Sequence, residues 1–466
     1  MDPLDWLKVL SEALDKRAVA VAEAEAWYDG DHPIPDPPLN TAASSDREAR
    51  AAFAVMAKMA VTNFLAPVVD LPASKLRIEG FRFSTSSTSS DADLWAIFRR
   101  NHLTSDAPLA NLDAVKTGQS FAIVWPDADG KAQITMEDPS SVIVAYAAGS
   151  RRTRAAALKR WVDDDGYVCA TVYLPSGLYK YRAAQKRSEA AYAGAMGTEA
   201  FRASWVVRQP DGEAWPVPNP LGVVPVVEIR VNSTLKASRF GGGRPQFWKV
   251  LTDQKRINQT VMSRLVMMEN QSFRQRWATG WDYPTNQDGT PDKAALQKAS
   301  AARLWTFEDE NVKVGEFAQA DFSPVLKAVQ EDVKVIASST STPPYAFLLG
   351  DMVNIAADAL ARIDGSHRTV CISLADQVDE AWSEIMQLAL KAENDERAAD
   401  GGISTVWGEF EQRTATEQAA LATTKKDLGA PAEVVFATLP DVDQAEARRW
   451  VLENDAAALT AEALAP

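Results

Sequence analysis

Residues 321–392 read DFSPVLKAVQEDVKVIASSTSTPPYAFLLGDMVNIAADALARIDGSHRTVCISLADQVDEAWSEIMQLALKA, and the fold is decided in this stretch. Apolar residues recur at three- and four-residue steps in its first part, which predicts an amphipathic helix at residues 321–338. Hydroxyl-bearing residues then compete for backbone hydrogen bonds, and Pro343 and Pro344 cannot continue a helix. The pattern therefore predicts that this helix ends just before the two prolines.

A loop at residues 339–354 precedes a second, longer helix. Asn354 is a residue type that caps helices well, and neither proline nor a cap signal interrupts the pattern over residues 355–395. The apolar stripe of this helix consists of Ile363, Val370, Leu374, Val378, Trp382 and Ile385. At 1.5 Å per residue the helix would be roughly 55 Å long. We expect it to separate two ends of the molecule, with the loop held at one of them.

The composition predicts a soluble protein with one large core or several smaller ones. Hydrophobic residues make up 46% of the 466 residues, and no window approaches an apolar run long enough to cross a membrane. The first residues lack the basic and apolar blocks of a signal peptide. We therefore expect no membrane association and no secretion by that route.

The net charge of −14 bears on nucleic-acid binding. A conventional DNA-binding protein is usually basic, because neutralised phosphates supply much of its affinity. An acidic protein can still handle DNA if the duplex must slide without sticking, so charge alone leaves both possibilities open. Between Arg151 and Arg208, eleven basic residues outnumber five acidic ones. That span is compatible with a solvated strand face, a subunit contact or a surface near DNA.

Isolated cysteines and histidines predict neither a disulfide framework nor a metal site. Cys169 and Cys371 are far apart and have no nearby cysteine partner, while His32, His102 and His367 each stand alone. We interpret them as free thiols, in the core or at the surface, and as solvated histidines. We expect no cofactor.

Recognisable catalytic motifs are also missing from the sequence. It contains no P-loop, no Gly-x-Ser-x-Gly elbow and no HExxH. We interpret as a hinge the glycine run 241–243 together with the two residues that follow it, Gly241-Gly242-Gly243-Arg244-Pro245. The acidic run Asp163-Asp164-Asp165-Gly166 is interpreted as a hairpin turn.

The N-terminal half combines helices with a meander of short strands. Helices are expected at residues 1–30 and around Leu94–Phe98 and Leu109–Val115. From Gly118 the period changes to two, which is typical of strands. The expected strands are Phe121–Trp125, Ala132–Met136, Val142–Tyr146, Leu158–Val162, Tyr167–Leu174 and Leu178–Arg182. The chain is thus predicted to be of the α+β class.

Several motifs resemble the portal proteins of tailed bacteriophages, of the long-tailed siphovirus type found in actinobacteriophages. The segment Asn354-Ile355-Ala356-Ala357-Asp358-Ala359-Leu360 is similar to the family's Asn-x-Ser-x-x-Ala-Leu, with Ala356 in place of the serine. The more specific match is Asp253-Gln254-x-x-x-Asn258 followed by Phe273-Arg274-Gln275-Arg276-Trp277-Ala278-x-Gly280, which resembles the first stem helix. The resemblance covers nearly the whole chain in order.

The resemblance implies a portal fold and a division of the chain into regions. These are a wing at 1–240, a first stem helix at 241–276, a clip at 277–320, a second stem helix at 321–338, a tunnel loop at 339–354, a long helix returning to the wing at 355–395 and a crown-like region at 396–466.

Two sets of site residues follow from this division. The channel-narrowing tunnel loop would comprise Ser341, Thr342, Pro343, Pro344, Tyr345, Phe347, Leu348, Leu349, Gly350, Asp351, Met352 and Asn354. The clip contacts with neighbouring subunits or a docked partner would include Trp281, Tyr283 and Trp305. The alternative is that these aromatic residues form a miniature core within the clip.

The implied function is structural and not enzymatic. Family members form dodecameric rings at one capsid vertex, through which double-stranded DNA is packaged, retained and ejected. The implied partners are the terminase large subunit, a head-tail adaptor, and the major capsid and scaffolding proteins. The protein would reside in the virion, and in the host cytoplasm during assembly. A related capsid-associated head-tail connector and a metal-dependent nuclease are the alternatives.

Overall fold

The computed structural model describes residues 1–33, 54–83, 90–186, 198–210, 212–236, 239–272, 276–279, 290, 313–316, 321–347, 357–399, 401–410, 415–439, 442 and 446–454. The chain divides into two compact units, which are treated separately. Unit 1 comprises Met1–Asp29, Leu65–Lys249 and Thr340–Pro466. Unit 2 comprises Gly30–Phe64 and Val250–Ser339.

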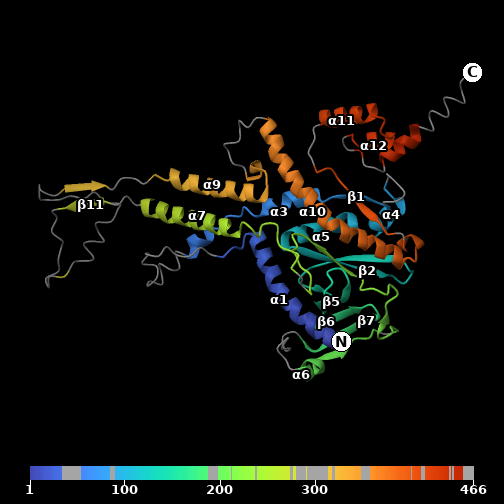
Figure 1. Cartoon of the computed structure of the whole chain (residues 1–466). Helices are drawn as coiled ribbons and strands as arrows, with labels where there is room; N and C mark the ends of the chain where they lie inside the picture. Colours follow the sequence, from blue (N-terminus) through green and yellow to red (C-terminus); the bar gives the residue numbers. More distant parts are fainter. Residues whose placement is uncertain are drawn as a thin grey trace, which may run out of the picture. The chain divides into compact units, whose positions relative to one another are not determined.

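Unit 1 contains most of the sheet structure (Figure 1). A three-stranded antiparallel sheet has the order β10-β2-β3, and a six-stranded sheet has β4-β5-β6-β7-β8 with β9 paired to β7. The strands of the first sheet are β2 (Gln119–Pro126), β3 (Ala132–Glu137) and β10 (Val226–Arg230). Those of the second are β4 (Val142–Tyr146), β5 (Arg154–Val162), β6 (Tyr167–Leu174), β7 (Gly177–Lys186), β8 (Trp205–Val207) and β9 (Val217–Pro218). The expected strands are confirmed, but the single expected meander is wrong, because β3 and β4 lie in different sheets and β2 pairs with β10 on its other edge.

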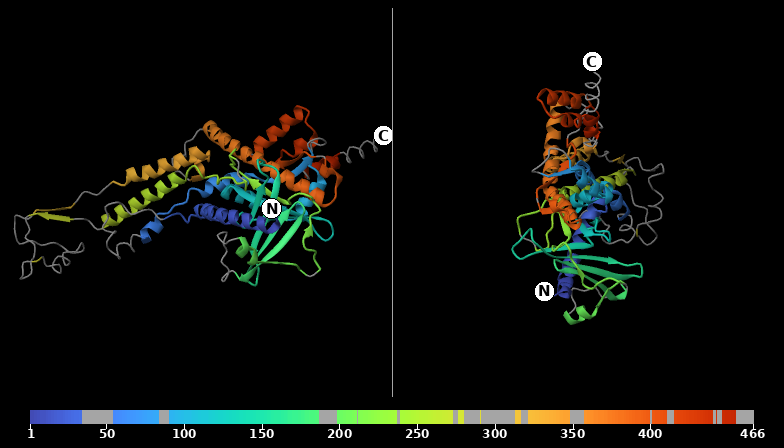
Figure 2. Two further views of the ribbon diagram at one scale, coloured as in Figure 1. Left: turned by 60° about the horizontal axis from the view of Figure 1, so that its bottom comes forward. Right: turned by 90° about the vertical axis from the view of Figure 1, so that its right-hand side faces the viewer.

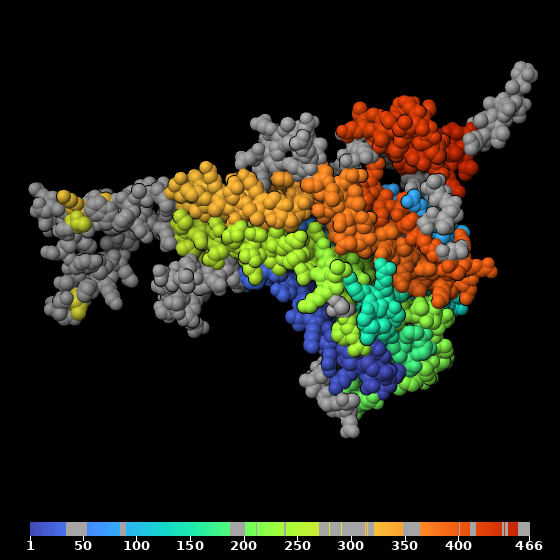
Figure 3. Space-filling model, in the orientation of Figure 1, coloured from blue at the N-terminus to red at the C-terminus, as the bar shows by residue number. Residues whose placement is uncertain are grey.

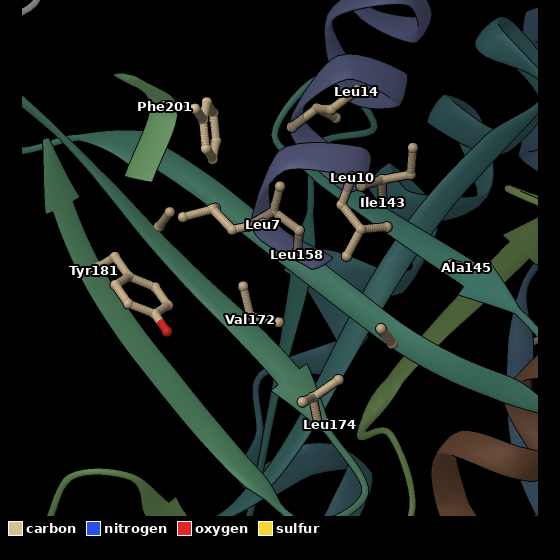
Figure 4. Packing of buried hydrophobic residues seen from close by; sticks show 12 residues of the cluster. Leu7, Leu10, Leu14, Ile143, Ala145, Leu158, Val172, Leu174, Tyr181 and Phe201 are labelled. Atoms are coloured by element: carbon tan, nitrogen blue, oxygen red, sulfur yellow. The ribbon is translucent and has the colours of Figure 1, made fainter. Parts of the chain in front are cut away.

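Helix α1 (Pro3–Asp29) covers one face of the six-stranded sheet (Figure 2). Its leucines Leu7, Leu10 and Leu14 recur at helical spacing and are fully buried. They pack against inward-facing residues of β4, β5 and β6, including Ile143 and Leu158 (Figure 4). The alternate residues of β4 belong to a second cluster with Phe121 and Val226, so both faces of this strand are buried. That cluster consists of Phe121, Ile123, Val142, Val144, Tyr146, Ala157, Tyr173, Leu178, Val224 and Val226.

Helix α10 (Ala357–Ala392) is the long helix that the sequence predicts, and four residues of its expected stripe are buried. They are Leu374, Val378, Trp382 and Ile385. The indole nitrogen of Trp382 donates to the Oδ1 atom of Asn111 at 3.0 Å, and the amide of Asn111 donates to the Leu76 carbonyl at 2.9 Å. The buried Asn111 therefore fixes α10 to α5 (Leu103–Thr117) and to the segment before β1 (Ile78–Phe83).

The remaining elements of unit 1 include a pairing between distant parts of the chain. Strand β13 (Ile403–Trp407) lies antiparallel to β1. The family resemblance assigns residues 403–407 to the crown-like region and β1 to the wing. The other elements are α3 (Ala66–Lys75), α4 (Ala92–Arg100), α6 (Thr198–Ala203), α11 (Ala415–Asp427), α12 (Ala432–Phe436) and the short 3-10 helices η2 (Pro344–Phe347) and η4 (Glu396–Ala399). Helix α3 contains Pro67 and Pro72 and was not expected.

Unit 2 is built on a pair of long helices, α7 (Leu251–Ser272) and α9 (Ser323–Thr340, whose last residue is assigned to unit 1). Helix α7 is therefore shorter than the helix predicted at 241–276. Residues Arg276–Thr279 form strand β11, which pairs antiparallel with β12 (Lys313–Glu316). The second predicted helix, at 321–338, is confirmed with ends shifted by two residues. It stops before the prolines, as expected.

Burial bears on the interpretation of the cysteines and histidines. Both cysteines are free, but they are buried. His32 and His367 are buried as well, so the interpretation of solvated histidines is wrong for them. Within the described ranges, no helix is long and apolar enough to cross a membrane, and no group of three or more His, Cys, Asp or Glu residues is placed to hold a metal ion.

Candidate functional site

Helices α7 and α9 lie side by side, and their surfaces adjoin in the space-filling view (Figure 3). Arg256 of α7 contacts Asp332 of α9 at 2.8 Å and also Asp253 one turn earlier at 2.9 Å. Several apolar side chains on the two helices are buried: Ile257, Val261, Met262, Val333, Ile336 and Ala337. This end of the helix pair therefore has a core of its own, with an ion pair at its edge.

Other apolar residues of the pair remain exposed. Met268 of α7 is 51% exposed, and Leu326 and Val335 of α9 are 46% and 41% exposed. Met268 and Leu326 are apolar residues of the two long helices α7 and α9. Unit 2 thus leaves apolar residues of both helices facing solvent, which is typical of helices whose remaining apolar surface is covered by another chain.

The Gln254 and Asn258 pair in the family-like motif has a structural role in unit 2. The Oδ1 atom of Asn258 accepts from the backbone and hydroxyl of Thr62 at 3.1 and 3.0 Å and from Gln254 Nε2 at 3.0 Å. Gln254 accepts from the Phe64 amide at 3.0 Å and donates to the Thr62 carbonyl at 2.8 Å. The Asn258 Nδ2 atom lies 3.0 Å from the Nδ1 atom of His32. With Nδ2 as the donor, His32 Nδ1 is the acceptor, so its proton is on Nε2.

These contacts explain the spacing of the motif. Gln254 and Asn258 are one turn apart, so both amides lie on the same face of α7. Both side chains are buried, and together they satisfy backbone groups of the segment that passes beside the helix. The sequence indicated that the motif was specific, but gave no signal that its partners were Thr62, Phe64 and His32.

The start of the predicted tunnel loop is fixed within unit 1. Ser341 adopts φ = 52°, and its carbonyl accepts a hydrogen bond from His367 Nδ1 at 3.2 Å. The hydroxyls of Thr340 and Thr342 lie 2.8 Å apart. Pro344 begins the short helix η2, in which the Tyr345 hydroxyl donates to Asp364 of α10 at 2.9 Å. The loop therefore leaves α9 through a closely constrained turn.

Burial differs among the residues that follow this turn. Thr342, Pro343 and Phe347 are buried in unit 1, whereas Tyr345 is exposed. Burial and the bond to Asp364 raise the pKa of Tyr345 to about 12. Because its side chain is buried, Phe347 serves as an apolar anchor for the start of the loop. The remaining predicted loop residues, Leu348, Leu349, Gly350, Asp351, Met352 and Asn354, lie outside the described residues.

His367 and Cys371 support the same turn from one helical turn apart. The Cys371 sulfur lies 3.6 Å from His367 Nε2. Burial lowers the pKa of His367 below 6.5, although its bond to the Ser341 carbonyl and the charge of Asp364 act in the opposite direction. Burial raises the pKa of the Cys371 thiol to about 11. Both groups are therefore neutral near pH 7.

The expected hinge at the glycine run is a tightly packed junction in the structure. A Cβ atom on Gly243 would lie 2.0 Å from the Val231 carbonyl oxygen and 2.2 Å from that of Gly118. The Arg244 amide donates to the Val231 carbonyl at 3.1 Å. Gly242 has φ = 109°, and its amide donates to the buried carboxylate of Glu228 at 2.7 Å. Glycine is required here by close backbone approach.

Glu228 was not indicated by the sequence, because it stands in a strand with no surrounding motif. The Tyr146 hydroxyl donates to its carboxylate at 2.7 Å, and Arg230 lies 3.6 Å away. Burial and this carboxylate raise the pKa of Tyr146. Arg17 is also close enough to be attracted to Glu228, although burial lowers the pKa of its guanidinium. A buried carboxylate thus holds α1, β4, β10 and the glycine run together.

Several basic residues of the span at 151–208 pair with acidic residues within unit 1. Arg154 pairs with Glu384 at 2.7 Å, Lys180 pairs with Glu213, and Arg160 pairs with Asp15. In the acidic run, Asp163 accepts from the Tyr167 amide at 2.8 Å, as expected of a hairpin turn. The predicted clip residues Trp281, Tyr283 and Trp305 lie outside the described part of the chain.

Comparison with known proteins adds to this geometry. The sequence profile of the family described as phage portal protein, SPP1 Gp6-like, matches residues 7–459. The chain belongs to this portal family. Its match to the portal protein of Mycobacterium phage D29 is 25% identical over 341 residues and covers 69% of the chain and 63% of the relative. For the portal protein of Mycobacterium phage L5 the identity is 26% over 348 residues, with the same coverage. The match thus spans less than two thirds of either relative.

Solved structures similar to this portal-family chain come from gene transfer agent particles. A chain from the virion of the native particle gives a TM-score of 0.43 at 11% identity, covering 80% of this chain and 90% of the other. A chain from the neck of the native particle, computed with C12 symmetry, gives the same TM-score and identity and covers 78% and 90%.

Proposed function

We propose that this portal-family chain assembles into a ring, with twelve subunits as the expected number, at one vertex of a phage capsid. Double-stranded DNA would pass through the ring during packaging, and the ring would then retain the genome and take part in its ejection. The family match over residues 7–459 carries this proposal. The exposed apolar residues of α7 and α9 support it, because a ring supplies neighbours that cover them.

The charge of the chain suits a channel. A net charge of −14 repels DNA phosphates and so disfavours tight binding of the duplex to a channel wall. Such a ring would guide DNA without holding it at fixed positions. ATP hydrolysis would be supplied by the terminase, and we propose that the chain itself is not an enzyme.

The regional assignments remain part of this proposal. The helix pair α7 and α9 would form the stem, and residues 277–320 would form the clip. Trp281, Tyr283 and Trp305 would contact neighbouring clips, the terminase large subunit or the head-tail adaptor, since aromatic residues dominate many interfaces. Unit 1 would supply the wing, which would meet the major capsid and scaffolding proteins. The location would be the virion, after assembly in the host cytoplasm.

The tunnel loop would act as a collar around the duplex. Its start is fixed by Ser341 and Tyr345, which bond to α10. Asp351 is the one charged residue between Lys334 and Asp358, so strong binding of the loop to phosphates is not expected. The collar would act through its shape, and its contacts with DNA would depend little on salt.

A two-part experiment tests the proposed function. A phage that lacks its portal gene would be complemented with this chain, and the DNA protected inside particles would be measured. We expect protected DNA only when the chain is supplied. In parallel, the purified chain would be incubated with DNA and magnesium or ATP. Cleavage or hydrolysis that follows the protein through purification, without restored packaging, would overturn the proposal in favour of an enzyme.

A further inference from the structure

A basic pocket of about 270 Å³ lies in unit 1 at the glycine junction. It is lined by the side chains of Arg151, Arg230, Thr234 and Lys236 and by the glycine run 241–243. Its volume is close to the lower end of small-ligand pockets, roughly 300 Å³. The charged side chains among these lining residues are all cationic.

Hydrogen bonds to backbone groups fix the walls of this pocket. The Tyr146 amide donates to the Arg239 carbonyl at 2.7 Å, which holds the chain just before the glycine run against β4. Arg151 donates to the Thr234 carbonyl at 2.8 Å, so one lining residue restrains another. Gly242 is bound to Glu228, as described above. The cationic groups are therefore presented by a preformed framework, which lowers the entropic cost of binding a ligand.

The positive charge of the pocket is only partly balanced. Glu228 is the carboxylate closest to Arg230, at 3.6 Å, and it is shared with Arg17 and already accepts from Tyr146 and Gly242. Arg151 bonds to a carbonyl, which carries no net charge. Lys236 is exposed and has no ion-pair partner in the parts of the chain that the structure describes. The pocket thus retains a surplus of positive charge.

In a neighbouring pocket of unit 1, by contrast, acidic residues balance the charge of the arginines. That pocket measures about 570 Å³ and shares Arg151 and Arg230. Its further arginines have acidic partners on α10: Arg154 pairs with Glu384 at 2.7 Å, and Arg152 lies 3.8 Å from Glu380. No residue of α10 lines the smaller pocket among the described residues.

We propose that the smaller pocket binds a phosphate group. Arginine guanidinium groups match phosphate oxygens through paired N–H donors, and lysine adds a compact positive charge. A phosphate carries the negative charge and the acceptors that the surplus requires. Its source is either a free phosphate compound or the backbone of DNA. This goes beyond the proposed ring function, because none of the residues that line the pocket belongs to the helix pair or to the loop assigned to the channel.

The test compares two variants of the full chain with equal changes in charge. The pocket variant carries Arg151→Gln and Lys236→Gln. The matched control carries Arg152→Gln and Lys249→Gln, whose side chains are also cationic but do not line this pocket. Binding of inorganic phosphate, pyrophosphate and a short DNA duplex would be measured at low salt by titration calorimetry and fluorescence anisotropy. Circular dichroism and thermal unfolding would verify that both variants fold.

We expect the pocket variant to bind the anion roughly tenfold more weakly or worse, and the control to bind like the wild type. Binding of phosphate or pyrophosphate with this pattern identifies a free anion as the ligand. Binding of the duplex alone, with the same pattern, identifies the DNA backbone. Absence of binding by the wild type, or equal losses in the two variants, overturns the proposal. If the pocket variant does not fold, Lys236→Gln alone would be compared with Lys249→Gln by the same criteria.

Discussion

Asn258 shows how one side chain can determine the path of a distant segment. Its amide joins α7 to Thr62 and His32 through buried hydrogen bonds. We predict that Asn258→Leu lowers the free energy of unfolding by about 2–4 kcal/mol, because several buried polar groups lose their partner together. Chemical denaturation would measure this difference.

Thr260→Ala in the same helix is the matched control. Among the described residues, the hydroxyl of Thr260 bonds to the Arg256 carbonyl of its own helix and to no other group. Its removal should therefore change the free energy of unfolding by less than about 0.5 kcal/mol. Equal effects of the two substitutions would show that the Asn258 network contributes nothing specific.

His367 predicts a dependence of stability on pH. Its pKa in the folded chain is below 6.5. As the pH falls through about 6.5, the unfolded chain gains a proton on this residue while the folded chain does not. The unfolded state then binds more protons, so stability decreases. The contribution is fully present above that pH and is lost toward the lower folded pKa.

His367→Gln removes this titration and provides the comparison. We predict that the unfolding temperature of the wild type falls relative to that of the variant between about pH 7 and pH 5.5. Asp364 and Lys75 are the other charged groups that act on His367, and both are retained in the variant. A temperature difference that stays constant over this range would contradict the assignment.

Two residues of α9 allow the stability of the subunit and the formation of the ring to be tested separately. Ile336 is fully buried, whereas Leu326 on the same helix is 46% exposed. We predict that Ile336→Ala destabilises the subunit by about 2–4 kcal/mol through cavity formation. Leu326→Ala should leave the stability of the subunit nearly unchanged but weaken ring formation. Denaturation and light scattering would be measured for both variants, and normal assembly of Leu326→Ala would contradict a neighbour covering this residue.

The proposed role of the tunnel loop can be tested by a deletion that keeps its buried residue Phe347. Phe347 is buried, so the deletion should begin after it and remove residues 348–352. We predict that rings still form and that less DNA is packaged or retained, because the collar is lost. A second variant, in which glycine and serine replace the same five residues, would separate the effect of loop length on packaging from the effect of the apolar side chains. Normal packaging by assembled deletion rings would show that the segment is only a connector.

The same elements show how far the sequence could be interpreted. Helical periodicity and Pro343-Pro344 predicted α9, α10 and the turn between them, because these signals are local. The pairing of β1 with β13 was missed, because alternation identifies a strand but not its partner more than 300 residues away. The end of α7 at Ser272 was missed as well, since no proline or glycine precedes strand β11.

The candidate site was likewise predicted only in part. The position of the loop follows from its prolines and from the family resemblance. Its contacts with Asp364 and His367 do not, because an isolated histidine carries no sign of what will surround it. The burial of Glu228 also depends on segments brought together by folding, including Tyr146 and Gly242.

At the scale of the whole molecule, two features bear on the proposed assembly. Unit 2 leaves apolar residues of both helices exposed, while the chain carries a net charge of −14 that opposes nonspecific association. The proposed closed ring would account for both features, since each copy would cover its neighbour and no apolar stripe would remain free to recruit further chains. The family match over residues 7–459 and the geometry of α7 and α9 therefore support the same assembled state.

End-on electron micrographs of the negatively stained, purified protein test this claim most directly. We predict closed rings around a central channel, with twelvefold rotational symmetry in averaged images. Well-dispersed single subunits at micromolar concentration, or open and irregular chains without a closed ring, would contradict it.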